Sequence, residues 1–394
     1  MIVIEKALEI VLSESHNYGA EHIPLLKCVG HILAEDIITD RDAPPFDRVM
    51  MDGIAIRLGE LSNSPEDHYT IQGIQAAGTP QMTLKDNKSC LEVMTGSILP
   101  KNTDTVIPYE ALRIENSSVF ILNKTILQRH IHYKGSDCRA GKLVLPKVKK
   151  INTADVGILA TIGKALVRVA KRPKVAIIST GNELVDVHEN PKKHQIRSSN
   201  SYTLFAALTR EGLAPTLFHF PDNRVGLHQG LSELIIEYDV LLLSGGVSKG
   251  KFDLVPEVLN TIGVEKLFHG VAQKPGKPFW FGKHRSTQTK VFAFPGNPLS
   301  TFVSYHYYFR QWLYLSMGCP LPLPVKPLAQ SLPGNKSLSQ FIPVKLCPLT
   351  DGASPLTNNG SGDLFVLAQS DGFILLPPSV AAFKEGVHFP FLGF

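Results

Sequence analysis

The sequence predicts a multidomain chain in which one three-layer α/β domain, built on a parallel sheet, is combined with small β-rich domains. Between about residues 173 and 320, apolar β-branched runs alternate with stretches of helical periodicity, the pattern of parallel strands with crossover helices. On both sides of that segment, short apolar runs are broken by Gly, Pro, Asn and Asp, as in small β domains. A chain of 394 residues is long enough for roughly two to four such domains.

Four strand–helix pairs make up the predicted α/β domain. The strands are expected at 175–180, 217–220, 240–246 and 291–298, and the helices near 200–212, 224–236, 253–261 and 299–315. Asn200 or Ser201 is expected to cap the first of these helices, because either side chain can accept a hydrogen bond from a free backbone N–H group.

Three further segments complete the predicted element order. Residues 1–16 are expected to form an amphipathic helix, since apolar residues recur there at helical spacing and two glutamates interrupt the run. These glutamates also argue against a secretion signal. Residues 142–172 are predicted as strand, helix and strand, with the helix starting at Asn152 or Thr153. A Pro-rich stretch after residue 319 leads into the last β segment.

Composition excludes several classes of protein. Hydrophobic residues make up 43% of the chain and charged residues 19%, which is ordinary for a globular protein and argues against wholesale disorder. The net charge of +5, with no basic helix or zinc motif, does not indicate a nucleic-acid partner. No apolar run approaches the roughly 20 residues that span a membrane. The five cysteines are scattered, so we expect no disulfide framework or zinc site, and a cytoplasmic location.

Unusual polar sequences follow three of the predicted parallel strands. They are Ser179–Glu183, Ser244–Asp253 and Pro295–Pro298. Ligands of open parallel sheets bind beyond the carboxyl ends of the strands, and paired glycines and helix N-termini favour oxyanions there. Lys274–Pro278 adds two lysines in a loop bounded by prolines, which could act as point charges for an anion. Each segment alone could be an ordinary turn or cap, but together they favour a ligand site.

Four acidic residues are candidates for hard oxygen ligands of Mg²⁺. Three follow strands of the α/β domain, namely Glu183, Asp222 and Asp253, and Asp52 lies in a Met-Asp-Gly loop of the preceding β segment. Magnesium is commonly bound by one or two carboxylates together with substrate phosphate. On the residues alone any of the four could contribute to a metal site, and it is together with the resemblance described next that Glu183 and Asp253 become the expected protein ligands.

The order of these segments resembles the molybdopterin molybdenumtransferase family, which includes bacterial MoeA and the E domain of gephyrin. The resemblance covers most of the chain and rests on these motifs: PPFDRVMMDG (44–53), MTGSILP (94–100), STGNEL (179–184), IRSSN (196–200), SGGVSKGKFD (244–253), KPGKP (274–278) and PGNP (295–298). The STGNEL and SGGVS types of motif also occur in adenylyltransferase-like relatives, whereas the MDG and MTG pair does not.

The resemblance implies four structural domains and an elongated homodimer. The expected domains are residues 1–20 with 38–43 and 142–172 (connecting and dimerisation), 21–37 with 44–141 (small, β-rich, with the MDG and MTG loops), 173–320 (α/β, molybdopterin-binding) and 321–394 (C-terminal β). The MDG and MTG loops of one subunit are expected to face the α/β domain of the other.

The resemblance also implies an activity: Mg²⁺-dependent insertion of molybdate into adenylyl-molybdopterin, with release of AMP. The catalytic residues it implies are Asp52, Thr95, Glu183, Asp222 and Asp253. The substrate-binding residues it implies are Ser199, Asn200, Ser244, Gly245, Gly246, Ser248, Lys274, Lys277, Pro295, Gly296, Asn297, Pro298 and Ser361. Protein partners could include molybdopterin adenylyltransferase and molybdopterin synthase, and no membrane or nucleic acid is expected.

The chain departs from the family pattern at a few positions. Asn182 replaces a frequent Asp, Lys251 stands where many members have Glu, and Leu338 and Ser339 stand where a basic residue is common. Two other functions stay open on sequence alone. One is an adenylyltransferase-type enzyme of the neighbouring step, and the other is a non-catalytic scaffold like the gephyrin E domain.

Overall fold

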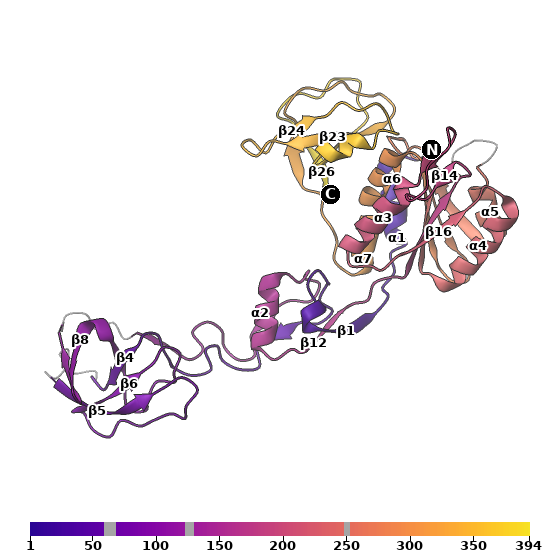
Figure 1. Ribbon diagram of the computed structural model, residues 1–394. Coiled ribbons are helices and arrows are strands. Elements are labelled where there is room, and N and C mark those ends of the chain that lie inside the picture. Colours follow the sequence, from indigo (N-terminus) through magenta and orange to yellow (C-terminus); the bar gives the residue numbers. More distant parts are fainter. Residues whose placement is uncertain (59–67, 123–129, 248–252) are drawn as a thin grey trace. The chain divides into compact units, whose positions relative to one another are not determined.

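The computed structural model describes residues 1–58, 68–122, 130–247 and 253–394 (Figure 1). The chain forms two compact units. The first comprises Met1–Ala34, Val148–Thr153 and Leu166–Phe394, and the second comprises Glu35–Lys147 and Ala154–Ala165. Each unit is thus assembled from segments that are far apart in the sequence. The four domain boundaries expected above are finer than this division and stay a prediction.

The centre of the first unit is a mixed sheet whose strand order is β16-β13-β17-β21-β20-β18. Its strands are β13 (Val175–Thr180), β16 (Thr216–Phe220), β17 (Val240–Ser244), β18 (Val264–His269), β20 (Trp280–His284) and β21 (Lys290–Phe294). The first four in the spatial order run parallel, which confirms the predicted parallel sheet. The antiparallel strands β20 and β18 extend one edge, an addition that the sequence analysis did not contain.

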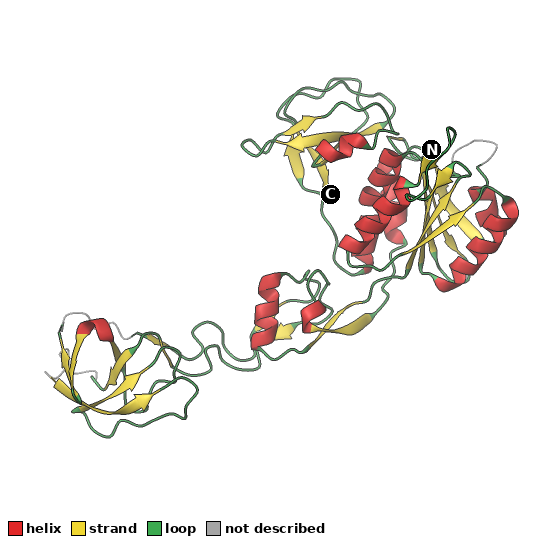
Figure 2. Ribbon diagram, viewed as in Figure 1, coloured by secondary structure: helices red, strands yellow, loops and turns green. Residues whose placement is uncertain are grey.

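Helices cover both faces of this sheet, as the three-layer prediction required (Figure 2). One face carries α1 (Ile4–Ser13), α3 (Ser199–Arg210), α6 (Pro298–Ser304), the π-helical turn η3 (Tyr305–Phe309) and α7 (Arg310–Ser316). The other face carries α4 (Arg224–Glu237) and α5 (Val255–Thr261). Strands β13, β17 and β21 are buried along their whole length, because helices shield both of their faces.

The start of α3 differs from the prediction. The helix begins at Ser199 and its cap residue is Ser198, so neither Asn200 nor Ser201 caps it. The side chain of Asn200 donates instead to Ser244 and to the carbonyl oxygen of Gly296. The helix therefore starts before Asn200, and the amide nitrogen of that side chain makes tertiary hydrogen bonds to two other strand ends.

A second sheet lies toward the C-terminus of the first unit, with strand order β19-β23-β25-β26-β22 and with β24 paired to β23. Its strands are β19 (Gln273–Lys274), β22 (Val325–Pro327), β23 (Ser339–Leu346), β24 (Ala353–Pro355), β25 (Gly372–Leu376) and β26 (His388–Gly393), and η4 (Phe365–Gln369) is a short 3-10 helix beside it. Strand β19 belongs to the lysine loop of the α/β segment. It pairs in parallel with Ser339 and Gln340 of β23.

The remaining elements of the first unit are short. They are β1 (Ala20–Pro24), η1 (Leu25–Lys27), β12 (Leu166–Ala170), β14 (Leu184–Val185) and β15 (Ile196–Arg197). Strands β1 and β12 form an antiparallel pair. The N-terminal helix α1 has the amphipathic character that was expected, and its buried residues Ile4, Ala7 and Val11 join the core beneath the sheet of the α/β segment.

The second unit is mainly β, with a six-stranded sheet in the order β7-β4-β6-β5-β9-β8. Its elements are β2 (Ile37–Ile38), β3 (Arg48–Val49), β4 (Gly53–Ile56), β5 (His68–Gln75), β6 (Ser89–Val93), β7 (Thr105–Pro108), η2 (Tyr109–Ala111), β8 (Leu112–Glu115), β9 (Ser118–Ile121), β10 (Ile131–His132), β11 (Leu143–Leu145) and α2 (Thr153–Thr161), whose first residue falls in the first unit. Helix α2 begins where the sequence predicted. No helix in the described ranges is long and apolar enough to cross a membrane.

Candidate active site

A cavity of ≈ 680 Å³ opens at the carboxyl ends of β13, β17 and β21. Twelve of the residues selected from the sequence line it: Glu183, Ser199, Asn200, Asp222, Ser244, Gly245, Gly246, Asp253, Pro295, Gly296, Asn297 and Pro298. The parallel register explains this convergence, since Ser179 of β13 is level with Ser244, and Ser244 is level with Phe294 of β21. Chain segments more than 100 residues apart in sequence thus end at one edge of the sheet.

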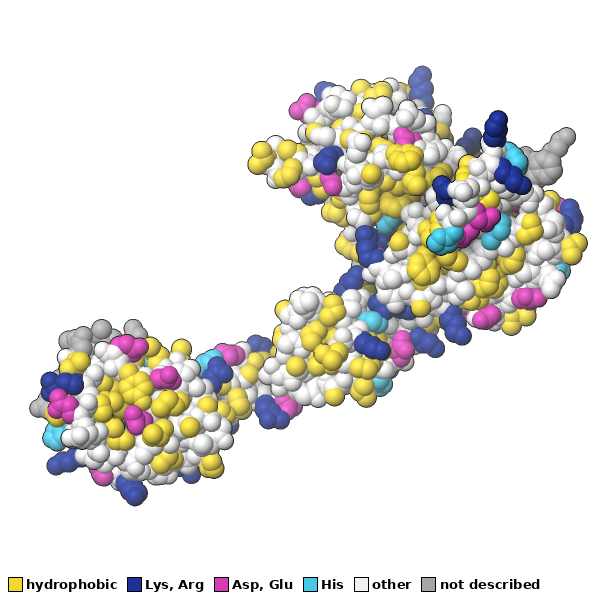
Figure 3. Space-filling view, in the orientation of Figure 1, with side chains coloured by type: hydrophobic (Ala, Val, Ile, Leu, Met, Phe, Trp, Pro, Cys, Tyr) yellow, Lys and Arg dark blue, Asp and Glu magenta, His cyan; other side chains and the backbone are white. Residues whose placement is uncertain are grey.

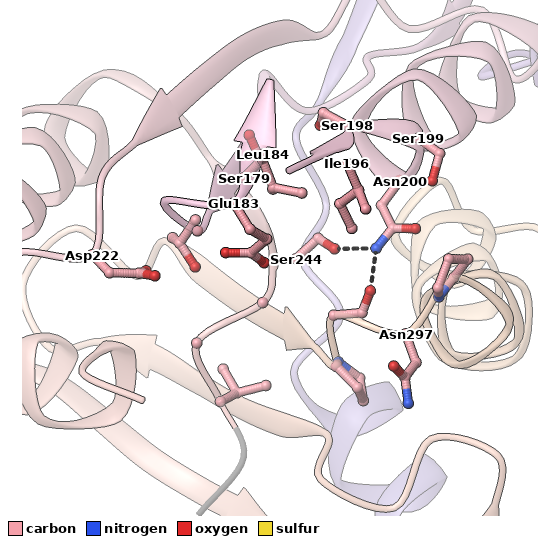
Figure 4. A pocket seen from close by; sticks show the side chains of 18 of the residues that line it. Ser179, Glu183, Leu184, Ile196, Ser198, Ser199, Asn200, Asp222, Ser244 and Asn297 are labelled. Atoms are coloured by element: carbon pink, nitrogen blue, oxygen red, sulfur yellow. Dashed lines mark hydrogen bonds between the residues drawn. The ribbon is translucent and has the colours of Figure 1, made fainter. Parts of the chain in front are cut away.

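Asn200 ties the walls of this cavity together. Its side-chain amide donates to the hydroxyl of Ser244 at 2.8 Å and to the carbonyl oxygen of Gly296 at 2.8 Å. Figure 4 shows Asn200 and Asn297 on one side of the cavity, and Glu183 and Asp222 on the other. Asn200 therefore holds the strand ends in place, because both hydrogens of its amide group are used for contacts within the protein.

The acidic side of the cavity carries Glu183, Asp222 and Asp253. Partial burial raises the pKa of Asp222; the backbone N–H of Asn182 opposes that shift, and the negative charges of Glu183 and Asp253 add to it. Asn182 and Asp222 also hold each other's loops, since the backbone N–H of each donates to the other's side chain, at 3.3 and 3.2 Å. Asn182 thus positions an acid of the site although it carries no charge itself.

A second cavity of ≈ 310 Å³ adjoins the first and shares Pro278, Pro295 and Asn297 with it. It is lined by Lys274, Lys277 and Ser361, which the sequence analysis selected, and also by Leu338 and Gln340. Of the described residues that line it, the two lysines are the only cations. The lysine loop therefore supplies all the positive charge of the described lining of this cavity, and Leu338 adds none.

Asp52 and Thr95 lie outside these cavities. Thr95 donates its backbone N–H to a carboxylate oxygen of Asp52 at 2.6 Å, and this hydrogen bond lowers the pKa of the exposed Asp52. Both residues belong to the second unit. Ser248 and Lys251 lie outside the described residues.

Several lining residues of the larger cavity were not among the candidate site residues selected from the sequence. Thr180, Arg197 and Ser198 are polar examples. Arg197 and Ser198 belong to the IRSSN motif, so this motif contained the signal for them. Thr180 belongs to the STGNEL motif, but it was not selected as a site residue because the sequence gives no indication of where its hydroxyl points.

The fold and the two cavities define a class of protein: an α/β protein with ligand-sized cavities at the carboxyl ends of its sheet. Family models match nearly the whole chain. Residues 2–163 match the MoeA N-terminal region (domain I and II), residues 176–314 match a probable molybdopterin binding domain, and residues 326–394 match the MoeA C-terminal region (domain IV).

Individual relatives agree with these models. A molybdopterin molybdenumtransferase of Synechocystis sp. is 42% identical, over 99% of this chain and 99% of its own length. A protein of the same name from Staphylococcus aureus is 30% identical, over 98% and 94% of the two chains. A crystal structure of the molybdopterin biosynthesis MoeA protein from Pyrococcus horikosii is 29% identical with a TM-score of 0.83, covering 100% and 99% of the two chains. The chain belongs to the molybdopterin molybdenumtransferase (MoeA) family, which confirms the resemblance; it is accordingly an enzyme of the transferase class.

Proposed function

We propose that this protein inserts molybdate into adenylyl-molybdopterin and releases AMP. The observation that carries the proposal is the pair of adjoining cavities that share Pro278, Pro295 and Asn297. The larger one offers hydroxyls, glycine backbone and carboxylates, which suit a phosphate ester with a metal ion. The smaller one offers Lys274 and Lys277, which suit a compact dianion such as molybdate. Two reactants held side by side are what such a transfer requires.

The donor set of the larger cavity fits a magnesium ion. Glu183, Asp222 and Asp253 line it, and their mutual repulsion contributes to the raised pKa of Asp222, a strain that a cation would relieve. In the described ranges no three His, Cys, Asp or Glu side chains come close enough to hold an ion by themselves. Glu183 and Asp253 would hold it with substrate phosphate oxygens. When bound, Mg²⁺ neutralises charge on the phosphoryl oxygens.

The residues of the site then divide the work. Lys274 and Lys277 bind molybdate close to the dithiolene, so that the two dithiolene sulfurs can replace oxygens on molybdenum, which leave as water with the thiol protons and protons from solvent. Ser244 and the backbone of Gly245 and Gly246 hold the phosphates while the pyrophosphate bond is broken by water and AMP leaves. Asp222, on the acidic side of the same cavity, orients the water that breaks this bond.

We also propose that the protein acts as a homodimer, in which Asp52 and Thr95 serve the cavity of a second copy. Helix α2 supports the dimer. Its sequence TADVGILAT is apolar nearly all round, yet only Asp155 and Leu159 are buried, and Ile158 is 37% exposed. Such a helix is normally covered on most sides. Hydrophobic side chains lie on the visible surface of the segment that carries α2 (Figure 3). The cytoplasmic location and the partner enzymes expected from the sequence stay predictions.

The test is AMP release from purified protein supplied with adenylyl-molybdopterin and Mg²⁺, with and without molybdate. Release that depends on molybdate, matched by an equal amount of active molybdenum cofactor, is the expected result. ATP consumption with molybdopterin as substrate would instead indicate the adenylyltransferase-type reaction. Tight substrate binding without AMP release under any of these conditions would rule out catalysis and favour the scaffold function.

A further inference from the structure

The hydroxyl of Thr180 is buried and has no hydrogen-bond partner among the described residues. Thr180 is 3% exposed and is the last residue of β13, where it lines the larger cavity. A buried hydroxyl without a partner costs stability, so native proteins nearly always satisfy such groups. An orphan group in a ligand cavity indicates a partner that arrives with the ligand.

Neighbouring hydroxyls of the same sheet edge are already engaged. The Ser179 hydroxyl bonds to the ring nitrogen Nδ1 of His219 at 3.0 Å, and the Ser244 hydroxyl accepts from Asn200 at 2.8 Å. The Thr301 hydroxyl donates to the carbonyl oxygen of Pro295 at 2.6 Å. The Thr180 hydroxyl therefore differs from these neighbouring hydroxyls, which form hydrogen bonds within the protein.

Two glycines form a cradle next to this hydroxyl. A Cβ atom would lie 3.1 Å from the Thr180 Oγ atom if placed on Gly245, and 3.0 Å if placed on Gly246. Both residues also have positive φ angles, +102° and +67°, which disfavour any other residue. Because neither glycine has a side chain, their backbone lies close to the buried Thr180 hydroxyl at the wall of the cavity, and consecutive glycine backbone of this kind is a common part of oxyanion sites.

The N-terminus of α3 faces the same cavity. Its cap residue Ser198 and its first residues Ser199 and Asn200 line the cavity wall. The Ser198 side chain makes no capping hydrogen bond, and the first turn carries no acid. A helix start of this kind attracts an anion through its backbone N–H groups and dipole. It provides a second source of donors beside the Thr180 hydroxyl.

We propose that Thr180 is a further substrate-binding residue, whose hydroxyl donates to a phosphoryl oxygen of a pyrophosphate or phosphate ester in this cavity. That this phosphoryl group belongs to adenylyl-molybdopterin rests on the function proposed above. The hydroxyl then gains the acceptor that it lacks in the free protein. Thr180 acts with the Gly245–Gly246 backbone and the start of α3, which supply further hydrogen-bond donors to the bound group.

The test compares Thr180→Val, Thr180→Ser and the control Thr289→Val by titrating the full-length protein with inorganic pyrophosphate in the presence of Mg²⁺. Thr289 is equally buried, at 2% exposure, but its hydroxyl donates at 2.8 Å to the carbonyl oxygen of Ile235 and does not line either cavity. We expect Thr180→Val to bind pyrophosphate about tenfold more weakly while melting up to about 2 °C higher. Thr180→Ser should keep the affinity. Thr289→Val should keep the affinity and melt lower.

Two results would overturn the proposal. One is unchanged pyrophosphate affinity in Thr180→Val. The other is an equal loss of affinity in Thr180→Val and Thr180→Ser together with lower melting temperatures, which would assign Thr180 to packing. Failure of the proposed function is a separate outcome: the wild-type protein would then bind pyrophosphate through Thr180 without forming molybdenum cofactor from adenylyl-molybdopterin.

Discussion

The side-chain amide of Asn297 donates a 2.7 Å hydrogen bond to the hydroxyl of Ser361, which joins the start of α6 to a loop of the C-terminal sheet. The carbonyl oxygen of Ser361 accepts a second bond, from the backbone N–H of Leu299 at 3.1 Å. Asn297 and Ser361 both line the cavity that holds Lys274 and Lys277. The two bonds therefore fix the loop that closes this cavity.

Ser361→Ala should weaken molybdate use without unfolding the protein. Loss of the bond to Asn297 frees the loop, and we expect the KM for molybdate in AMP release to rise about five- to tenfold. Ser370→Ala is the matched control, because the hydroxyl of Ser370 bonds to Val366 in the same segment and lies outside both cavities. An equal effect of both variants would show that general loosening, rather than the Asn297–Ser361 bond, is responsible.

The double variant Lys274→Ala, Lys277→Ala should impair the use of molybdate but not the binding of pyrophosphate. Removal of two charges should raise the KM for molybdate by about a hundredfold or abolish the reaction. Pyrophosphate, which we place in the larger cavity, should bind with nearly unchanged affinity. The control is Lys345→Ala, an exposed lysine on β23 that lines neither cavity. A parallel loss of pyrophosphate and molybdate binding would contradict the assignment of separate ligands.

Asp222→Asn should stabilise the free protein at neutral pH while reducing activity. Burial and the charges of Glu183 and Asp253 raise the pKa of Asp222 above its usual value in the folded protein. The folded state therefore loses stability as the pH rises from the unfolded to the folded pKa of this group, and the whole cost is present at pH 7. The amide variant has no such cost. Differential scanning fluorimetry at pH 7 should show a higher melting temperature, and a lower one would refute the electrostatic argument.

His306 should make the protein sensitive to acid. It is 2% exposed, and burial together with the charges of Arg310 and Arg210 lowers its pKa to about 3. The folded state cannot take up the proton that the unfolded chain binds below its ordinary pKa of about 6.5. Stability should thus be lost as the pH falls from about 6.5 toward 3. His306→Phe should reduce the difference in melting temperature between pH 7.5 and pH 5, and an unchanged difference would disprove this role.

Mixed dimers can test whether Asp52 serves a second copy. Asp52→Ala and the double lysine variant should each be inactive alone. If Asp52 and the lysines of one site come from different subunits, mixed dimers contain one intact site, and an equimolar mixture recovers about a quarter of wild-type activity. If Asp52 and the lysines of one site come from the same chain, every site in the mixture lacks either Asp52 or the two lysines, and the mixture stays inactive. No recovery after subunit exchange would therefore refute the shared site.

Much of the α/β fold could be predicted from the sequence, for a physical reason. Strands β13, β17 and β21 are buried on both faces. Strands of this kind consist almost entirely of apolar residues, and they can therefore be recognised in the sequence as continuous apolar runs. Strands β18 and β20 lie toward one edge, and their sequences VEKLFH and WFGKH mix charge with aromatics. Their antiparallel pairing depends on long-range contacts, which a local pattern does not contain.

The same distinction applies to the site. The glycine-rich segments were recognisable because they directly follow apolar strands of the predicted parallel sheet, where such sheets bind their ligands. The bridging role of Asn200 was missed, and a local capping role was assigned to it, because its partners Ser244 and Gly296 are 44 and 96 residues away. Thr180 was missed because its lack of a partner is a property of the packed structure alone.

Strand β19 has a consequence for recombining such proteins. Gln273 and Lys274 lie next to β23 in the C-terminal sheet although they precede it by more than 60 residues. A chimera that takes residues 321–394 from a relative would thus graft a sheet whose edge strand still comes from the recipient. The C-terminal sheet therefore cannot be exchanged as a complete module by a crossover near residue 320, because its edge strand β19 lies before that point in the sequence. A crossover that keeps the lysine loop and β23 from the same parent should yield folded hybrids more often than one placed between them.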